Sequence, residues 1–470
     1  MHFRPGSFLL CLLVGGICSA NSGTRETRKI GIIGAGIGGT STAYYLRELL
    51  QKQNIHVDIT IFEAEDRLGG RTLSPVFTRP KRPSIPLSMG ASLFVSCNYN
   101  LMNLTKRFSL PVQQEFGEQL ENSTSDLWNG REFLWKGSPV ARYGPENFEK
   151  LEGVISSMLS RFLRVYDHDL MWTSVNGLFK SLGLDDMLGV TGYDYFIQQG
   201  LNETFVKEHL DFATRSNYAR GITEIHALAA SIATIPVAGA CTTHSITSGN
   251  AGLSKELAAR SRSKVLLKRR VKAIFRRRGK YVVVPSKGKP QAFDYLVIAT
   301  PIHLSGLSFA PNIQYPSVNY TQVQVTHVTG RVKPAYFNVA DGLLPTDISV
   351  TSPPGAKLPF NSLYRLANYQ PEKGIYMYHL QTTGSLQPAT LTHLFESLKK
   401  EVVQVTWNAY PTMTTTGVQQ EFPVELSPGL YYLNTMEPFI STMETETLSA
   451  RNIARLIGKR IRRSLVHRTQ

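Results

Sequence analysis

A glycine-rich turn near the start of the chain constrains the fold more than any other feature. The β-branched run KIGII (29–33) is typical of a buried parallel strand, and GAGIGG (34–39) follows it directly. We expect a helix over 40–51 and a second strand over 56–62. A strand, a glycine turn, a helix and a strand in this order predict a βαβ unit that binds a dinucleotide.

Each residue of this unit has a mechanical role in dinucleotide binding. Gly34 permits the tight turn, Gly36 lets the backbone approach a pyrophosphate, and Gly39 lets the helix pack close to the strand. The N–H groups at the start of the helix, with the positive end of its dipole, favour phosphate binding. Glu63 ends the second strand, where a carboxylate accepts hydrogen bonds from ribose hydroxyls and rejects a 2′-phosphate.

Length and charge limit the class of protein. The 470 residues suffice for two packed domains, and 42% hydrophobic with 18% charged residues is typical of a chain with an ordinary core. The net charge of +16 suits acidic partners. The basic residues are scattered, and neither zinc-finger spacing nor an RNP-like sequence accompanies them, so we expect no nucleic-acid binding.

The first twenty residues are typical of a signal peptide. Arg4 precedes an apolar run over 8–17 that is too short to span a bilayer, and small residues at 18–20 form a cleavage site. We therefore expect entry into the secretory pathway and no transmembrane span, with lysosome or vacuole and the cell exterior as alternative destinations. Four Asn-x-Ser/Thr triplets are predicted glycosylation sites: Asn103, Asn122, Asn202 and Asn319.

Cysteines and histidines argue against a metal site. Cys11 and Cys18 leave with the signal peptide, so only Cys97 and Cys241 remain. These two form either one disulfide or two buried thiols, and the sequence leaves both open. The eleven histidines show no metal-ligand spacing, and we expect no metal.

The segment after the second predicted strand specifies the dinucleotide. It reads EAEDRLGGR (63–71) and resembles the Glu…Arg-x-Gly-Gly-Arg string of FAD oxidases of the amine-oxidase superfamily. The resemblance implies that FAD is the cofactor, that Gly70 brings backbone against it, and that Arg67 and Arg71 offset phosphate charge. It also places Val271 on the strand that faces the adenine, although Val271 equally suits a plain core position.

The order of predicted elements indicates an α/β chain with two interleaved domains. Further strands are expected over 265–272, 280–284, 295–299 and 431–433, and helices over 253–261 and 447–463. The last helix either packs its apolar side on the cofactor sheet or contacts a membrane surface peripherally. The FAD-binding Rossmann-type domain is expected from discontinuous segments, and the α+β substrate domain carries a mainly helical insertion. The boundaries are 28–111, 221–300 and 406–463 for the FAD domain, 112–220 for the insertion and 301–405 for the β-rich substrate domain.

The C-terminal stretch resembles prenylcysteine oxidases, known in plants as farnesylcysteine lyases. The strings YYLNTME (431–437), STMET (441–445) and ARNIARLI (450–457) carry the resemblance, and WNAYP (407–411), RSNY (215–218) and ATPIHL (299–304) agree with it over about 28–460. It implies that Glu437 holds ribityl hydroxyls and that the helix starting near Thr442 and Met443 points N–H groups at the flavin. The candidate substrate-pocket residues are Asn217, Tyr218, Trp407 and Tyr410.

The resemblance also implies a reaction. S-Farnesyl- or S-geranylgeranylcysteine would lose hydride to flavin N5 and yield cysteine, a prenyl aldehyde and, with oxygen as acceptor, hydrogen peroxide. The cofactor carries the difficult step, so no catalytic side chain is assigned.

The chain departs from the family pattern at SMGAS (88–92), Val95, Ala219-Arg220 and HSITSGN (244–250). These departures leave two alternatives: an oxidase of another lipophilic amine or thioether, and a flavin-binding secretory protein without catalysis.

Secretion leads to a direct test. Endoglycosidase treatment of the protein made in a eukaryotic host is expected to increase its gel mobility, because attached glycans are removed. An unchanged mobility together with an intact Met1 N-terminus would contradict the expectation.

Overall fold

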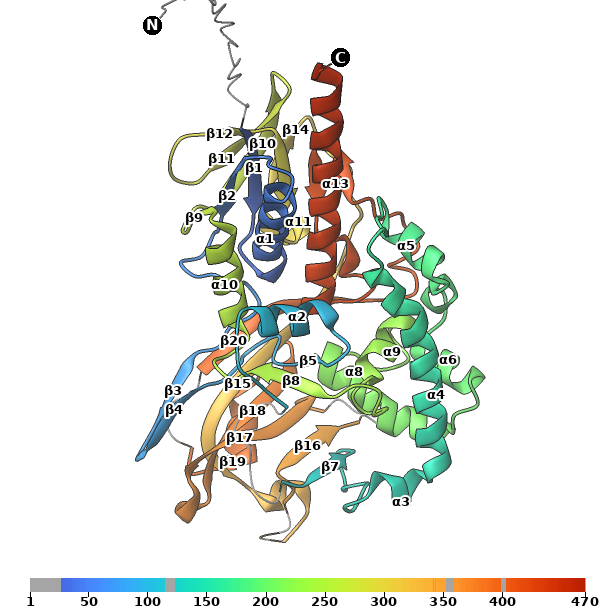
Figure 1. Ribbon diagram of the computed structural model, residues 1–470. Coiled ribbons are helices and arrows are strands. Elements are labelled where there is room, and N and C mark those ends of the chain that lie inside the picture. Colours follow the sequence, from blue (N-terminus) through green and yellow to red (C-terminus); the bar gives the residue numbers. More distant parts are fainter. Residues whose placement is uncertain are drawn as a thin grey trace, which may run out of the picture.

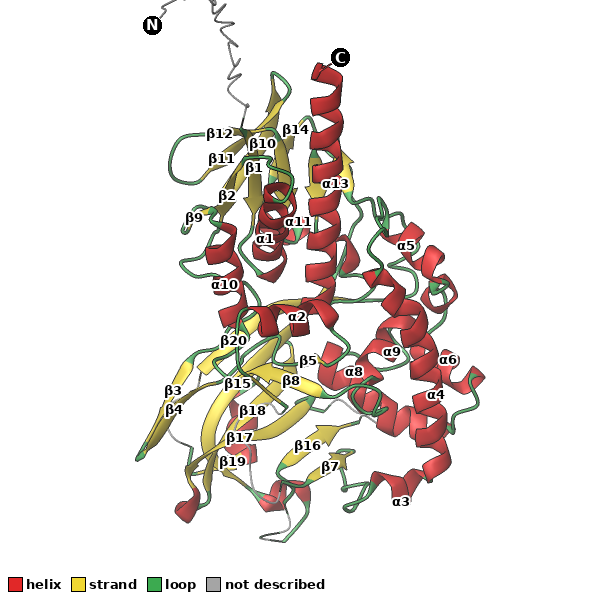
Figure 2. Cartoon of the chain, viewed as in Figure 1, coloured by secondary structure: helices red, strands yellow, loops and turns green. Residues whose placement is uncertain are grey.

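The computed structural model describes residues 27–114, 123–340, 342, 344–351, 358–398 and 403–469. The expected signal peptide and Asn122 lie outside these residues. Two layered parts are visible in Figure 1. We call the part with α1, α10 and α13 the cofactor part, after the expected FAD domain, and the part built on a large sheet the substrate part, after the expected substrate domain. Helices gather along one side of the substrate part, and its strands occupy the other (Figure 2).

The cofactor part is built on a six-stranded sheet in the order β21-β22-β13-β1-β2-β9. The central strand β1 runs parallel to both neighbours, β2 and β13, which confirms the predicted Rossmann-type unit. Segments from distant parts of the chain complete the sheet: β1 (Arg28–Ile33), β2 (Val57–Phe62), β9 (Lys264–Leu266), β13 (Tyr295–Ile298), β21 (Glu425–Ser427) and β22 (Leu430–Tyr432).

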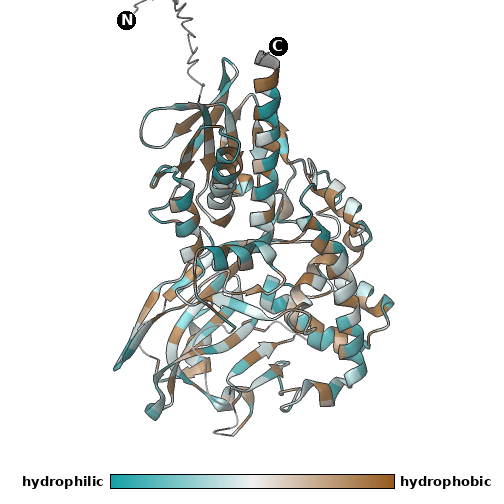
Figure 3. Ribbon diagram, in the orientation of Figure 1, coloured by the Kyte–Doolittle hydropathy of each residue, from teal (hydrophilic) through white to brown (hydrophobic). Residues whose placement is uncertain are grey.

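The long helices of this part are α1 (Ile37–Gln51), α10 (Ala251–Ser261) and α13 (Met443–Thr469). Helix α1 packs against β2, and α10 packs against α1. Helix α13 packs along α1, and its residues Leu448, Ile453, Ile457 and Ile461 are fully buried. Apolar and polar residues alternate along α13 in Figure 3, as expected for a helix with one covered side. Of the two alternatives, the last helix therefore packs on the cofactor part. No helix within the described residues is long and apolar enough to cross a membrane.

The strand expected over 265–272 is wrong, because the chain changes sheets there. Strand β9 ends at Leu266, and β10 (Val271–Arg277) begins in a separate four-stranded sheet. Between them, the N–H groups of Lys268 and Arg269 donate to the carbonyls of Glu65 and Glu63. The other strands of the second sheet are β11 (Lys280–Pro285), β12 (Gln291–Phe293) and β14 (Ser308–Ala310).

A seven-stranded sheet carries the substrate part, in the order β19-β15-β18-β17-β16-β7, with β20 on β15. Strand β20 runs to Pro411, beyond the expected boundary at 405, because it pairs with β15 along its length. Strand β7 joins from within the segment expected to be helical. The strands are β7 (Ser125–Trp128), β15 (Tyr320–Val332), β16 (Asp347–Val350), β17 (Ser362–Gln370), β18 (Ile375–Thr383), β19 (Phe395–Glu396) and β20 (Val403–Pro411).

The helical layer extends beyond the expected boundary at residue 220, because α9 packs on α6 and α8. Its helices are α3 (Pro139–Tyr143), α4 (Pro145–Phe162), α5 (Val175–Leu182), α6 (Gly192–Gln198), α7 (Glu203–Phe205), α8 (Asp211–Tyr218) and α9 (Ala227–Thr234), with a π-helical turn at Val206–Leu210. Elsewhere lie α2 (Tyr99–Arg107), α11 (Ile302–Ser305), α12 (Pro388–Leu394) and the short strands β3 (Val76–Arg79), β4 (Arg82–Pro86), β5 (Phe94–Val95), β6 (Val112–Gln113) and β8 (Thr243–Ile246). The 3₁₀ turns are Leu163–Tyr166, Asp185–Leu188, Pro334–Phe337, Pro371–Lys373 and Asn434–Met436.

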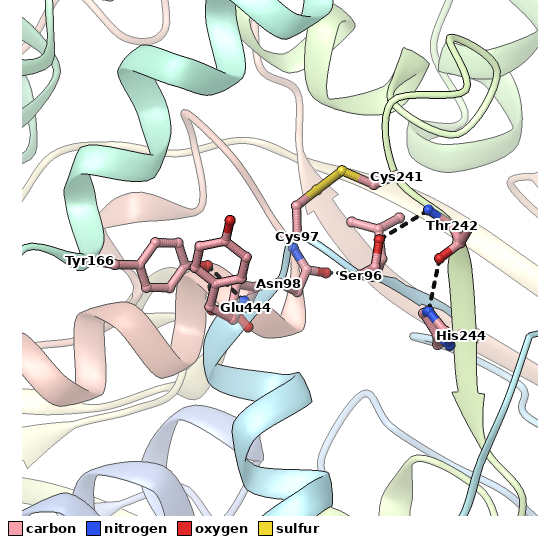
Figure 4. The surroundings of a disulfide bond; sticks show 10 residues. Ser96, Cys97, Asn98, Tyr166, Cys241, Thr242, His244 and Glu444 are labelled. Atoms are coloured by element: carbon pink, nitrogen blue, oxygen red, sulfur yellow. Dashed lines mark hydrogen bonds between the residues drawn. A yellow bond between two sulfur atoms is a disulfide. The ribbon is translucent and has the colours of Figure 1, made fainter.

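A disulfide joins Cys97 and Cys241, which resolves the two alternatives left by the sequence. Cys97 precedes α2 and Cys241 precedes β8, so the bond fastens two segments 144 residues apart (Figure 4). Next to it, the N–H of Thr242 donates to Ser96 Oγ at 3.1 Å.

A buried carboxylate ties α13 to α2. Glu444 accepts hydrogen bonds from the N–H groups of Asn100 (2.9 Å) and Leu101 (3.0 Å) and from the Tyr166 hydroxyl (2.6 Å). Figure 4 shows Tyr166 beside Glu444. The carboxylate of Glu444 thus accepts from two N–H groups that have no partner within the first turn of α2. Burial raises the pKa of Glu444, and the hydrogen bonds from these three donors lower it.

Removing this carboxylate is expected to destabilise the protein. Glu444→Ala leaves two buried N–H groups and the part-buried Tyr166 hydroxyl without their acceptor. The free energy of unfolding should therefore fall by about 3 kcal/mol in urea denaturation. The control is Glu256→Ala on α10, a half-buried residue whose carboxylate pairs with Arg260 on the same helix, which should cost less than about 0.5 kcal/mol. Equal losses in the two variants would contradict the assigned role of Glu444.

Candidate functional site

One cavity of about 1050 Å³ connects the glycine turn with the helical layer and the substrate sheet. Residues of both parts of the molecule line it, so a ligand that spans it touches both. Nearly all the predicted site residues lie along this cavity: Gly34, Gly36, Glu63, Gly70, Arg71, Asn217, Tyr218, Val271, Trp407, Tyr410, Glu437, Thr442 and Met443.

Two glycines of the turn are required by the protein itself. Gly34 has φ +106°, and a Cβ there would lie 2.4 Å from the Ala299 carbonyl oxygen. A Cβ on Gly39 would lie 2.0 Å from the Gly34 carbonyl oxygen. Gly39 therefore allows the close approach of α1 to β1, as the sequence predicted, and it does not line the cavity.

Gly36 differs, because no protein atom excludes a side chain there. Its φ of −70° suits any residue, and the nearest atom to an added Cβ is the Gly69 carbonyl oxygen at 3.9 Å. Gly36 lines the cavity at the start of α1, where N–H groups lack partners within the helix. The space above Gly36 is thus left for a ligand that approaches the backbone closely, and an anionic ligand suits it best.

Glu63 fastens the glycine turn to the end of β2. One carboxylate oxygen accepts from the Ala35 N–H at 2.8 Å, and the other accepts from the Glu65 N–H at 2.8 Å. The side chain is buried and lines the cavity. Contact with ribose hydroxyls stays a prediction, and it would use the lone pairs that these two bonds leave.

The two arginines of the Arg-x-Gly-Gly-Arg string have different surroundings. Arg67 donates to the carbonyls of Gly70 (2.8 Å) and Thr72 (3.3 Å), pairs with Glu65 and does not line the cavity. It therefore holds the loop in shape. Arg71 does line the cavity and forms an ion pair with Glu437.

Glu437 is the centre of a buried polar cluster. Its carboxylate accepts from Arg71, from the Tyr320 hydroxyl (2.8 Å) and from the Asn434 side-chain amide (2.8 Å), and it is only 1% exposed. Arg71 also donates to the Ala409 carbonyl at 2.9 Å. The cluster lies beside the first turn of α13, whose Thr442 and Met443 line the same cavity.

The four candidate substrate residues form one wall. The Tyr218 and Tyr410 rings meet edge to face with centroids 5.4 Å apart, and burial raises the pKa of Tyr410 to about 12. Trp407 Nε1 donates to the Met89 carbonyl at 2.7 Å. Asn217 donates its amide to the backbone of α8 and α9. Internal hydrogen bonds thus hold the indole and the Asn217 amide in place. The two phenols are neutral near pH 7, because burial raises the pKa of each.

The sequence singled out none of the individual residues that form the apolar side of the cavity. Helices α4, α8 and α9 and the loop after α9 contribute Leu159, Phe162, Phe212, Ile232, Ile235 and Val237. Helical spacing indicated that these helices bury one face, but the same spacing arises whether the face covers a core or a cavity.

The individual residues of a polar strip on the substrate sheet were not singled out either. Asp347, Tyr364 and His379 lie side by side on β16, β17 and β18 and line the cavity with Gln381. Burial lowers the pKa of His379 to about 4, so the ring is neutral near pH 7, and it lies 3.1 Å from the His327 ring nitrogen. Alternation along each strand places such residues on one face, which was the available signal.

The residues around the glycine turn fit FAD. Open space over Gly36, the start of α1 and the polar cluster at Glu437 provide room for a pyrophosphate and hydrogen-bonding groups for a polyhydroxyl chain. The described residues contain no cluster of three or more His, Cys, Asp or Glu that could hold a metal ion.

Comparison with protein families gives two matches. Residues 120–468 match the family described as prenylcysteine lyase. Residues 32–108 match the NAD(P)-binding Rossmann-like domain.

Curated relatives align over nearly the whole chain. Farnesylcysteine lyase of Arabidopsis thaliana is 26% identical over 454 residues, covering 91% of this chain and 88% of the relative. Prenylcysteine oxidase 1 of Homo sapiens is 26% identical over 474 residues with the same coverage of each chain.

Solved structures of flavin amine oxidases share the fold. Cyclohexylamine oxidase from Brevibacterium oxydans superposes with a TM-score of 0.60 at 15% identity, covering 93% of this chain and 100% of that one. Wild-type putrescine oxidase bound to putrescine gives a TM-score of 0.58 at 13% identity, covering 92% and 99%.

Gly36 offers a test of the cofactor site that separates binding from folding. Gly36→Val is expected to weaken FAD binding at least about a hundredfold, equivalent to about 2.8 kcal/mol, because the side chain occupies the space over the turn. Fluorescence titration of the apoprotein measures the affinity, and circular dichroism should show an unchanged fold.

Two controls accompany this variant. Gly153→Ala on α4, where a Cβ meets nothing within 4 Å, should change neither property. Gly39→Ala should instead impair folding, since its Cβ collides with backbone. Wild-type FAD affinity in Gly36→Val would contradict the role of the turn.

Proposed function

The chain belongs to the prenylcysteine lyase family, and we propose that it is an oxidase that cleaves S-prenylated cysteine. It is an FAD-dependent oxidoreductase, and bound FAD supplies the hydride acceptor. In the proposed reaction one thioether, one water and one oxygen molecule yield cysteine, a prenyl aldehyde and hydrogen peroxide.

One observation carries the proposal: the apolar side of the cavity and the glycine turn line the same space. Phe162, Ile232 and Ile235 belong to the apolar side and would cover an isoprenoid chain. Burying such a chain removes apolar surface from water, which favours binding of a substrate that is otherwise uncharged along most of its length. The name farnesylcysteine lyase, carried by the Arabidopsis relative, agrees with this substrate class.

The wall that contains Tyr218, Trp407 and Tyr410 would orient the substrate. Trp407 is held by its hydrogen bond to Met89, and Tyr218 packs against Tyr410, so these rings would fix the position of the reacting carbon. A neutral thioether carries no proton that must leave before hydride transfer, so the uncharged phenol of Tyr410 suits the reaction. The side chains position substrate and are not required as acids or bases in this step.

The polar strip would receive the amino-acid end of the substrate. Asp347, Tyr364 and Gln381 offer carboxylate, hydroxyl and amide groups to the amino and carboxyl groups of cysteine. The cavity thus combines an apolar side and a polar side, as an amphipathic substrate demands.

We also propose that the protein acts in the secretory pathway. The Cys97–Cys241 disulfide is typical of an oxidising compartment, and Asn103, Asn202 and Asn319 are exposed as glycosylation requires. Molecular oxygen is the proposed final acceptor.

Anaerobic substrate addition tests the reaction. Farnesylcysteine is expected to bleach the oxidised flavin absorption in a single turnover, because hydride moves from the prenyl carbon to the cofactor. In air the same mixture should release cysteine, aldehyde and peroxide in equal amounts, without nicotinamide cofactor.

S-Methylcysteine is the matched control and should leave the flavin oxidised, because it cannot fill the apolar side of the cavity. If neither farnesyl- nor geranylgeranylcysteine reduces the flavin, the proposal fails. Reduction by a lipophilic amine would then favour an amine oxidase, and no reduction by any substrate would favour a binding protein.

A further inference from the structure

Two buried carboxylates face each other at the cofactor end of the cavity. The Asn434 side-chain amide lies 2.8 Å from Glu437 Oε1 and 3.3 Å from Glu446 Oε2, so one NH₂ group serves both acids. Glu437 is 1% exposed and Glu446 is 8% exposed, and all three residues line the cavity. Asn434 Oδ1 is buried without a hydrogen-bond partner and can accept a hydrogen bond.

The charges in this cluster do not balance if both acids are ionised. Arg71 is the cation of the cluster, and it pairs with Glu437. Among the described residues none forms an ion pair with Glu446. An ionised, unpaired carboxylate at this depth is costly, whereas the acid form can donate a hydrogen bond.

The groups around Glu446 from other elements favour its acid form. Burial and then the Glu437 charge raise the pKa of Glu446, while Arg71 lowers it. The neighbouring phenols are neutral, because burial raises the pKa of Tyr432 on β22 and of Tyr320 on β15. From α1, Gly38 faces the carboxyl group: a Cβ on Gly38 would lie 2.5 Å from Glu446 Oε2.

We propose that bound FAD holds Glu446 as a neutral carboxylic acid beside the glycine turn, and that FAD binding is coupled to the proton that the ionised fraction of the apoprotein must take up. The cofactor brings a pyrophosphate with negative charge to the start of α1, next to Gly38. A protonated Glu446 has no charge to repel the pyrophosphate, and its O–H can donate a hydrogen bond within the cluster. An ionised Glu446 repels the pyrophosphate. Glu446 is thus a positioning residue whose proton sets the strength of cofactor binding.

The direction of the pH dependence follows. Added negative charge makes the pKa of Glu446 higher with FAD bound than without it. Between the two pKa values, binding takes up a proton, so affinity is highest at acidic pH and falls as pH rises. For one proton the fall is at most about tenfold per pH unit. The inference rests on FAD binding and not on the thioether reaction.

Calorimetric titration of the apoprotein with FAD tests it, from about pH 5 to about pH 8, where His379 and Tyr410 do not titrate. Repeating each titration in two buffers of different ionisation enthalpy counts the protons taken up. We expect the wild type to take up a proton in a fraction that grows towards high pH, where more of the apoprotein has Glu446 ionised, and to lose affinity in parallel.

Glu446→Gln should keep the wild-type affinity of acidic pH, lose the pH dependence assigned to Glu446 and take up no proton. Glu48→Gln on α1 is the matched control and should behave as wild type, because its carboxylate pairs with Arg107 and does not line the cavity. Should Glu446→Gln fail to fold, Glu446→Ala replaces it with the same expectation for proton uptake. No proton uptake by the wild type, or an unchanged pH dependence in a folded Glu446 variant, overturns the proposal. FAD affinity and proton uptake are measured without substrate. The experiment therefore distinguishes failure of this proposal from failure of the proposed thioether reaction.

Discussion

The Arg71–Glu437 ion pair is the interaction on which the arrangement of the two parts depends. Arg71 follows β2 and Glu437 follows β22, so the pair joins the segments after two strands of the cofactor sheet. The same two side chains bond Tyr320 on β15 and the carbonyl of Ala409 on β20, strands of the substrate sheet. A buried pair is stable only when its remaining hydrogen-bonding groups are satisfied, and here both sheets supply them. The shape of the cavity between the sheets follows from this anchoring.

The cofactor end of the site could be predicted because its determinants are local. Gly34, Gly36 and Gly39 occur within six residues of a recognisable strand, and the carboxyl ends of parallel strands meet at one edge of a sheet. The strings around Arg71 and Glu437 are far apart in the chain, but each follows a predicted strand of the same sheet. Their convergence in one cavity therefore required no knowledge of side-chain packing.

What the sequence could not predict depends on contacts between distant segments. Arg67 and Arg71 belong to one motif, yet only the folded chain shows that Arg67 bonds its own loop and Arg71 reaches across 366 residues. Glu446 looks like any acid in the first turn of a helix, a position that usually favours negative charge. Its burial beside Glu437 reverses that expectation. Likewise, helical spacing could not distinguish the cavity wall at Phe162 from core packing.

The order of strands in the cofactor sheet has a consequence for biosynthesis. β1 and β2 emerge early from the ribosome, but their neighbours β13 and β22 and the cover helix α13, which spans 27 residues, come progressively later. Pairing across such sequence separations is slow, and uncovered strand edges aggregate. The N-terminal half of the nascent chain must therefore stay protected until translation is almost complete. A stop codon that removes only α13 would leave β1 and β2 without the helix that covers them. We expect such a product to be degraded or to aggregate, whatever the state of the residues in the cavity.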